Sequence, residues 1–207
     1  MTALIWPEAH GGPGCRITVP ADVAPGEAAR TLADRLRALS GRTATAWAPG
    51  QRGEGEGRDG QRAPARMPVV AIDGYSGSGK TTLARALVRL LEAWQVLHMD
   101  DWYPGWDGLE AGATIARRIA ADLRAGRPSS YVAWDWEEDA PGETKAVSAL
   151  PTIIEGCGAI DVDADLTIWL ADPGQAVRRR RALTRDGATY APHWQRWADQ
   201  DLGRFVN

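Results

Sequence analysis

Cysteine and long apolar runs are scarce in this 207-residue sequence. Its two cysteines, Cys15 and Cys157, are too few for a disulfide framework and too far apart in the chain for a zinc-binding cluster. No apolar run reaches the roughly 18 residues of a membrane-spanning helix, and residues 1–7 lack the basic-then-apolar order of a signal peptide. These absences predict a cytoplasmic protein with no membrane partner.

A large excess of charge of one sign is also absent. The formal net charge is −3 at pH 7, whereas a dedicated nucleic-acid binder usually needs a strongly basic surface, so we expect no nucleic-acid partner. Lysine is rare, because Lys80 and Lys145 are the only two in the chain. One of them falls in a glycine-rich loop, where a compact ammonium fits between phosphates in a way that a planar guanidinium does not reproduce.

That glycine-rich loop, residues 74–81, reads Gly-Tyr-Ser-Gly-Ser-Gly-Lys-Thr and fits the phosphate-binding pattern G-x-x-x-x-G-K-[ST]. An apolar run precedes the loop and an amphipathic helical pattern follows it, which is the setting that the motif requires. Glycines allow the backbone N–H groups to converge on phosphate oxygens. The pattern predicts Lys80 on the β- and γ-phosphates of ATP and Thr81 on Mg²⁺. The residues predicted to bind the nucleotide are Gly74, Tyr75, Ser76, Gly77, Ser78, Gly79, Lys80, Thr81 and Thr82.

Short apolar runs alternate with helical patterns along most of the chain. This alternation predicts an α/β fold of the P-loop NTPase type, with three α/β/α layers around a mainly parallel sheet. We expect an N-terminal strand-helix extension at 1–48, a flexible linker at 49–66 and a P-loop domain at 67–207. The strand patterns lie at 16–19, 69–72, 95–99, 152–154 and 166–170, and the helical patterns at 25–40, 80–93, 109–125, 173–184 and 192–202.

Acidic residues follow two of the predicted strands, at the sheet edge where parallel α/β proteins bind ligands. The carboxylate of Asp100 is placed to accept the proton of an attacking hydroxyl, and it is also a candidate Mg²⁺ ligand. Glu155 ends another apolar run and is a second candidate ligand. Further along, Arg178 to Arg181 are four consecutive arginines, of which we expect one or two to cover the phosphates.

Two stretches resemble the uridine kinase family, with its relatives the nicotinamide riboside kinases and phosphoribulokinases. They are Ile-Asp-Gly-Tyr-Ser-Gly-Ser-Gly-Lys-Thr-Thr-Leu-Ala at 72–84 and Asp-Asp-Trp-Tyr at 100–103. The resemblance covers most of the chain after the predicted linker. The segments 98–108 and 185–194 also resemble an actinobacterial subgroup of uridine-kinase-like proteins.

The resemblance implies roles for particular residues. Asp100 falls on the catalytic base of that family, and Glu155 falls on its strand-end glutamate near Mg²⁺. Arg181 and Arg185 fall on the arginines of its lid. The resemblance implies that these two arginines, together with Lys80, are catalytic residues. Members of the family also continue into a further strand that helps to seat the adenine. We expect residues 16–19 or a partner chain to supply that strand here, and a homodimer is therefore one option for the assembly.

The acceptor side of the predicted site is rich in tryptophan, with ten in the chain against one phenylalanine. Aromatic faces can stack on a flat base or ring. Acidic residues at 135–139 argue against an anionic acceptor, because like charges would repel it. The tryptophans expected near the crevice are Trp102, Trp106, Trp134 and Trp136, and the residues predicted to bind the acceptor are Asp101, Tyr103, Trp134 and Asp135.

Together these patterns predict a Mg·ATP-dependent kinase that phosphorylates a hydroxyl of a small, nucleoside-like molecule. Two alternatives remain open. One is a kinase of a natural-product or aminoglycoside-like hydroxyl compound, whose positive charge would suit the acidic stretch. The other is a regulatory module that binds a nucleotide without catalysis, since a P-loop alone does not specify a reaction.

Overall fold

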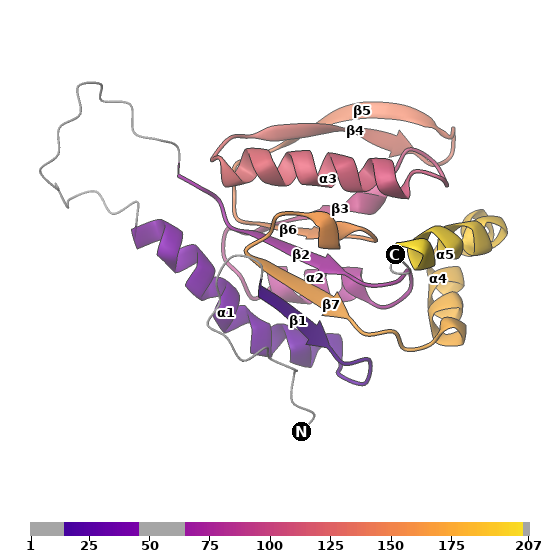
Figure 1. Cartoon of the computed structure of the whole chain (residues 1–207), viewed down its shortest axis with the longest axis horizontal. Coiled ribbons are helices and arrows are strands. Elements are labelled where there is room, and N and C mark those ends of the chain that lie inside the picture. Colours follow the sequence, from indigo (N-terminus) through magenta and orange to yellow (C-terminus); the bar gives the residue numbers. More distant parts are fainter. Residues whose placement is uncertain (1–14, 46–64, 205–207) are drawn as a thin grey trace, which may run out of the picture.

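A five-stranded parallel sheet forms the centre of the protein (Figure 1). The computed structural model describes residues 15–45 and 65–204. Within them the strand order is β1-β7-β2-β6-β3, and every neighbouring pair is parallel, which confirms the expected α/β fold. The strands are β1 (Cys15–Val19), β2 (Val69–Asp73), β3 (Gln95–His98), β6 (Thr152–Glu155) and β7 (Leu166–Leu170).

Helices cover both faces of this sheet (Figure 1). The side chains of β2 alternate between the faces: Val70 and Ile72 pack in one core with α1 and α2, and Val69 and Ala71 in the other with α3 and α5. Burial on both faces explains why the strands read as continuous apolar runs. The helices are α1 (Pro25–Thr45), α2 (Lys80–Val88), α3 (Leu109–Arg124), α4 (Gln175–Tyr190) and α5 (Trp194–Gly203), with short 3₁₀ turns η1 (Met99–Asp101), η2 (Ala159–Asp161) and η3 (Ala191–His193).

The N-terminal strand completes one edge of the central sheet. β1 pairs with β7 over its whole length, from Cys15 opposite Leu166 to Val19 opposite Leu170. The described part of the predicted extension therefore shares one sheet with the predicted P-loop domain. Nearly all of the predicted linker, 49–66, lies outside the described residues, and its flexibility stays a prediction.

Three helices end more than two residues from the position that the sequence predicts. The helix predicted at 25–40 continues to Thr45. The helix predicted at 80–93 ends at Val88, and the chain turns before β3 through Ala93, which has a left-handed φ of 58°. The helix predicted at 173–184 continues to Tyr190, with one interruption at Gly187 (φ 59°, ψ −135°).

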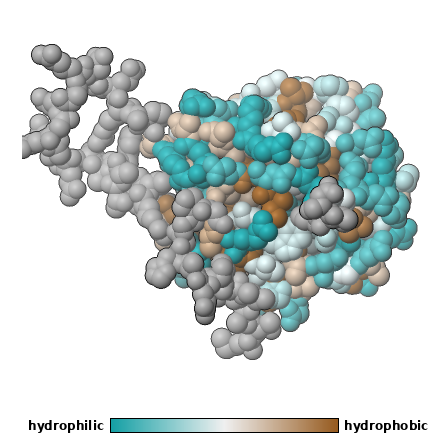
Figure 2. Space-filling model, in the orientation of Figure 1, coloured by the Kyte–Doolittle hydropathy of each residue, from teal (hydrophilic) through white to brown (hydrophobic). Residues whose placement is uncertain are grey.

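An antiparallel hairpin that the sequence did not predict lies over α3 (Figure 1). Its strands are β4 (Ser129–Asp135) and β5 (Ala140–Val147). Arg118 of α3 holds the hairpin by donating to the Ser129 hydroxyl and to the carbonyl of Ser130. On the face drawn in Figure 2, hydrophilic residues cover most of the described surface. Among the described helices, none has both the length and the apolar character that would let it cross a membrane.

Candidate active site

The glycine-rich loop forms a tight turn between β2 and α2, as its sequence predicts. The amide of Ser78 donates to the carbonyl of Tyr75 at 3.0 Å, and α2 begins at Lys80. Gly77 is required at its position because φ is +79° and a Cβ there would meet the carbonyl oxygen of Arg178 at 2.4 Å. Helix α4 thus packs directly on the loop.

The ammonium of Lys80 is buried inside this turn. It donates to the carbonyls of Gly74 at 2.6 Å and Tyr75 at 3.2 Å. Burial acts to lower the pKa of Lys80, but the surrounding acidic groups outweigh burial and raise it. Lys80 is therefore a fixed positive charge at neutral pH, as a phosphate ligand requires.

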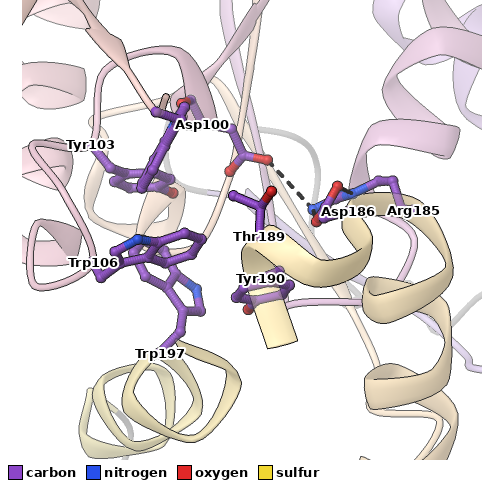
Figure 3. Close-up of a pocket in the computed structure, with 9 residues that line it drawn as sticks. Asp100, Tyr103, Trp106, Arg185, Asp186, Thr189, Tyr190 and Trp197 are labelled. Atoms are coloured by element: carbon purple, nitrogen blue, oxygen red, sulfur yellow. Dashed lines mark hydrogen bonds and ion pairs between the residues drawn. The ribbon is translucent and has the colours of Figure 1, made fainter. Parts of the chain in front are cut away.

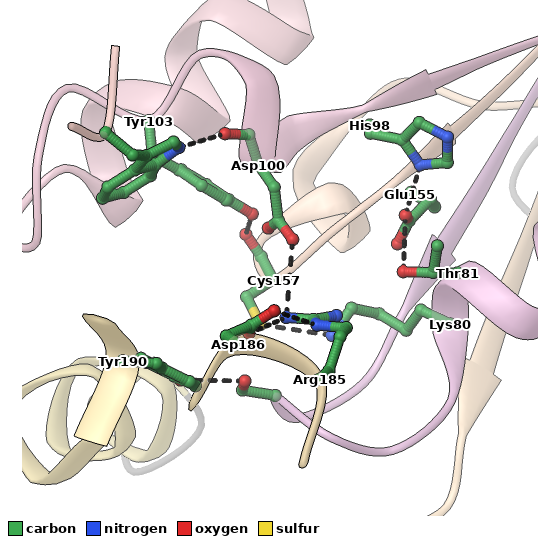
Figure 4. A network of polar contacts seen from close by, with 12 residues as sticks. Lys80, Thr81, His98, Asp100, Tyr103, Glu155, Cys157, Arg185, Asp186 and Tyr190 are labelled. Carbon is green, nitrogen blue, oxygen red and sulfur yellow. Dashed lines mark hydrogen bonds and ion pairs between the residues drawn. The ribbon is translucent and has the colours of Figure 1, made fainter. Parts of the chain in front are cut away.

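A short polar chain joins the start of α2 to two strand ends (Figure 4). Glu155 Oε1 accepts from the hydroxyl of Thr81 at 2.9 Å and pairs with His98 Nδ1 at 2.6 Å. Burial would raise the pKa of Glu155, yet the hydrogen bond from His98 and the charge of Lys80 hold it below its usual range. The same hydrogen bond raises the pKa of His98.

The oxygen atoms of this chain fit a magnesium ion. A hydroxyl and an ionised carboxylate are the hard donors that Mg²⁺ prefers, and Mg²⁺ commonly completes its shell with water and substrate phosphates. In residues 15–45 and 65–204, no cluster of three or more His, Cys, Asp or Glu side chains forms a preassembled metal site. Thr81 and Glu155 would thus hold the ion together with the nucleotide, beside Asp100 in the same crevice.

Asp100 lies at the end of β3 where two hollows meet. One is the phosphate crevice, about 430 Å³, lined by the loop residues, Glu155, Arg181 and Arg185. The other is an aromatic cavity of about 350 Å³ (Figure 3). The aromatic cavity is lined by Asp100, Tyr103, Trp106, Trp136, Arg185, Asp186, Thr189, Tyr190 and Trp197.

The carboxylate of Asp100 faces the guanidinium of Arg185 at 3.8 Å (Figure 3). The surrounding protein in the crevice raises the pKa of Asp100 although its side chain is 57% exposed, and the nearby charge of Glu155 adds to this, while Arg185 acts in the opposite direction. A raised pKa suits a carboxylate that accepts a proton during a reaction. The indole of Trp136 holds the backbone here by donating to the carbonyl of Asp100 at 2.8 Å.

The four consecutive arginines of α4 separate into different roles. Arg181 lines the phosphate crevice with Arg185 and reaches the carbonyl of Ser78 at 3.4 Å. Arg178 is buried, is ion-paired with Asp172 at 2.8 Å, and stacks over the ring of Tyr75. Arg179 and Arg180 lie on the exposed side of the helix.

The predicted acceptor residues are divided by the structure. Tyr103 lines the aromatic cavity and donates to the carbonyl of Cys157 at 2.8 Å. Asp101 turns to the hairpin instead, where it accepts from the hydroxyl of Tyr131. Trp134 donates to Asp139, and Asp135 accepts from the amides of the hairpin turn. Asp101, Trp134 and Asp135 are therefore not brought to the cavity, because the unpredicted hairpin engages all three.

Among the tryptophans expected near the crevice, Trp106 and Trp136 line the cavity and Trp102 is buried beneath it. Sequence reasoning missed the contribution of the C-terminal helices, including Tyr190, Trp197 and Asp201. One signal was present: Asp201 follows Trp197 by four residues, so a carboxylate sits on the apolar face of α5. It also missed Asp73, whose carboxylate joins the start of the loop to the turn that follows Glu155.

A third hollow, about 140 Å³, lies beside the loop at the C-terminal end of β1. Aliphatic and proline side chains make up most of its wall, and Arg181 closes it on the side of α4. The N-terminal segment supplies Val19, Pro20, Ala21, Val23, Pro25 and Ala28 to the lining, next to Ser78, Gly79 and Thr82 of the loop.

Comparison with known proteins places these observations in context. The strand–loop–helix motif and the parallel sheet decide the architecture. The fold is an α/β fold of the P-loop NTPase type. No family model matches the chain. Curated relatives include the cytidylate kinases of Pyrobaculum neutrophilum (28% identical over 134 residues, 60% of this chain) and Thermococcus sibiricus (28% over 149 residues, 67% of this chain). The chain spans 64% and 69% of the length of these two relatives.

Solved structures with similarity include that of a possible uridine kinase from Bacillus stearothermophilus, with 23% identity and a TM-score of 0.44. The alignment covers 84% of this chain and 92% of that chain. The sequence matches confirm that the chain resembles P-loop nucleotide kinases, while the resemblance to the actinobacterial subgroup stays a prediction.

Proposed function

We propose that this protein transfers the γ-phosphate of Mg·ATP to a hydroxyl of a small, nucleoside-like acceptor. One observation carries the proposal: Asp100 and Arg185 line both the phosphate crevice and the aromatic cavity. A base and a cation at the junction of two hollows can act on both the entering hydroxyl and the transferred phosphate. Phosphoryl transfer depends mainly on such positioning and charge neutralisation.

The donor side follows from the loop. Its backbone amides and Lys80 would bind the β- and γ-phosphates, and the aliphatic hollow at the end of β1 would take the base, with Arg181 against it. The strand that supplies this hollow is the N-terminal β1, which supports the expectation that residues 16–19 help to seat the adenine. Bound Mg²⁺ would neutralise phosphate charge beside Thr81 and Glu155.

At the junction, Asp100 would accept the proton of the acceptor hydroxyl as its oxygen bonds to the γ-phosphorus. The bond from that phosphorus to the β–γ bridging oxygen breaks, and ADP leaves with the bonding pair. Arg185 and Arg181 would neutralise the charge that develops on the transferred group. Tyr103 and the surrounding indoles exclude water from the acceptor side.

The lining of the aromatic cavity favours an unphosphorylated acceptor. It contains Asp100 and Asp186 against a single cation, Arg185, which is already paired with Asp186 at 2.7 Å. The names of the curated relatives point to a nucleoside monophosphate, but an added phosphate would meet uncompensated negative charge here. The same charge balance supports the second candidate, a cationic hydroxyl compound of the aminoglycoside type, because cations also bind well to indole faces.

The test is ADP release from Mg·ATP across nucleosides, nicotinamide riboside, sugars, aminoglycosides and nucleoside monophosphates. We expect one unphosphorylated acceptor to stimulate release strongly, and Lys80→Ala to abolish turnover. Asp100→Asn should retain ATP affinity and lower kcat by at least about 100-fold, the usual scale for a lost general base. Asp101→Asn is the matched control, because the carboxylate of Asp101 is adjacent in sequence to Asp100 but faces the hairpin.

The outcomes are distinct. Near-normal transfer by Asp100→Asn would refute its role as base. Stimulation by a nucleoside monophosphate alone would refute the inference that the negative charge of the aromatic cavity disfavours a phosphorylated acceptor. Binding of Mg·ATP with no stimulation by any acceptor would favour the regulatory alternative, a module that binds the nucleotide without turnover.

A further inference from the structure

We propose that the segment 190–201 positions the phosphate-binding loop and is itself held by the acceptor-side loop 104–108, so that the donor and acceptor sites are energetically coupled. The inference rests on the proposed function, because it requires that the two hollows bind the two substrates. It concerns residues to which neither the loop motif nor the family resemblance assigns a role.

The first and last residues of the segment both contact a single residue of the loop. The carboxylate of Asp201 accepts from the amide of Ser76 at 2.7 Å, and the hydroxyl of Tyr190 lies 2.9 Å from the Ser76 hydroxyl. Both contacts are buried, and Asp201 is only 1% exposed. Ser76 therefore owes its backbone and side-chain position to two residues that follow it by more than a hundred positions.

The other face of the same segment holds the acceptor-side loop. The ring of His193 stacks on Trp106 with centroids 4.2 Å apart and planes 8° from parallel. The side chain of Gln200 donates to the carbonyl of Trp106 at 2.7 Å. At the surface, Arg196 and Asp107 form an ion pair. Since Trp106 lines the aromatic cavity, a ligand there presses on a residue that the segment already contacts.

Helix geometry explains how one short element serves both sites. In α5, Arg196 and Gln200 lie four residues apart on one face, and Trp197 and Asp201 lie four apart on the adjacent face. A helix moves as a rigid unit, so a shift that Trp106 imposes on one face is carried to Ser76 by the other. A chain of packed contacts with two arrangements is the physical basis that coupling requires.

The experiment measures the affinity of Mg·AMP-PNP by titration calorimetry, with no acceptor present. The double variant His193→Ala/Gln200→Ala removes two of the contacts that hold the acceptor-side loop and touches neither the phosphate-binding loop nor the phosphate crevice. We expect it to weaken nucleotide binding about fivefold, at the lower end of typical coupling. Tyr190→Phe removes one of the two contacts with Ser76 and should weaken binding similarly. Gln195→Ala is the matched control, because Gln195 is exposed on α5 and bonds Asp199.

Two further variants separate coupling from damage. His193→Phe with Gln200 retained keeps a ring to stack on Trp106 and should restore wild-type affinity, which a general loss of packing would not allow. In the triple variant His193→Ala/Gln200→Ala/Tyr190→Phe, the loss of nucleotide affinity should be smaller than the product of the losses measured for the double variant and for Tyr190→Phe. Both changes act along one path, so their effects overlap. Arg196→Gln, at an exposed ion pair, keeps the test available if the double variant folds poorly and should give a smaller loss.

The inference is overturned if His193→Ala/Gln200→Ala binds Mg·AMP-PNP as the wild type does, or if its effect and that of Tyr190→Phe multiply in full. Failure of the wild type to bind the nucleotide would instead refute the proposed function. The two failures are thus distinguishable in one titration series.

Discussion

Asp73, at the end of β2, shows how a single buried carboxylate organises the site. One of its oxygens accepts from the amide of Gly74 at 2.6 Å, and the other accepts from the amides of Gly158 at 3.1 Å and Ile160 at 2.8 Å. It therefore ties the start of the phosphate-binding loop to the turn that follows Glu155. The two strand ends that carry the proposed donor site are held together by this residue.

The ionisation of Asp73 gives a pH-dependent prediction. Burial raises its pKa from 3.8 to about 6, so the folded state binds the proton more tightly than the unfolded chain does. The contribution of Asp73 to the free energy of unfolding is then largest below about pH 4 and is lost as the pH rises through about 6. We expect the difference in unfolding free energy between wild type and Asp73→Asn to fall by up to about 3 kcal/mol across this range. Urea denaturation at several pH values measures it.

Asp122 provides a control of opposite sign. The hydrogen bond from Arg127 lowers the pKa of Asp122, so its contribution is present at higher pH and is lost as the pH falls. The difference between wild type and Asp122→Asn should therefore change in the other direction with pH. A difference for Asp73→Asn that stays constant, or that grows with rising pH, would contradict the raised pKa.

Single residues were predictable from sequence where their role is local. The loop residues and Lys80 form a contiguous motif whose backbone geometry allows little choice, and the structure places them together. Asp101 and Asp135 were predicted to bind the acceptor because the segments that contain them were expected near the crevice. The direction of their side chains depends on the β4–β5 hairpin, which lies far from the motif and gave no sequence signal.

At the scale of elements, that hairpin shows why pattern reasoning fails at exposed strands. All five central strands were predicted, and in the three inner strands β2, β6 and β7 burial on both faces leaves a largely apolar run. In β5, residues Pro141 to Ala146 are exposed and only Val147 is buried. Without a buried face there is no alternation of apolar and polar side chains, and the segment reads as a loop.

The interruption of α4 at Gly187 gives a prediction about an element. Its φ of 59° and ψ of −135° form a conformation that is accessible mainly to glycine, although no atom would obstruct a side chain there. It separates Arg185, on the phosphate side, from Tyr190, which contacts the loop. We expect Gly187→Ala to lower the free energy of unfolding by about 1–3 kcal/mol through backbone strain alone. Thermal or urea unfolding measures the change.

Gly203 is the matched control for this substitution. It also has open space around a Cβ, but it is the last residue of α5 and has no left-handed backbone. Gly203→Ala should be neutral or stabilising by up to about 1 kcal/mol, because alanine is the better helix former. Equal effects of the two substitutions would show that the interruption at Gly187 is not strained for other residues.

Over the whole molecule, the proposed donor site draws on both ends of the described chain. β1 and the residues after it line the hollow beside the loop, and Asp201 of α5 holds Ser76. The sequence predicted a strand at 16–19, and the sheet order places it as β1 beside β7, while its part in seating the adenine stays a proposal. It predicted a helix at 192–202 but not the contact of that helix with the loop, whose one local sign is the carboxylate of Asp201 on the apolar face of α5.

A site built from both ends of the chain should link nucleotide binding to the stability of the whole protein. A ligand that binds only the folded state raises the free energy of unfolding by about 2.7 kcal/mol at 100 times its Kd. For a chain of this size, this corresponds to a rise in Tm of roughly 5–10 °C.

We expect Mg·AMP-PNP to give such a shift in a thermal unfolding assay, and EDTA to reduce it by removing the ion that Thr81 and Glu155 would share with the phosphates. Lys80→Ala should abolish the shift while leaving a cooperative transition. An undiminished shift in Lys80→Ala would mean that the nucleotide binds elsewhere, because Lys80 is the cation that the carbonyls of Gly74 and Tyr75 hold inside the loop, where the triphosphate would lie.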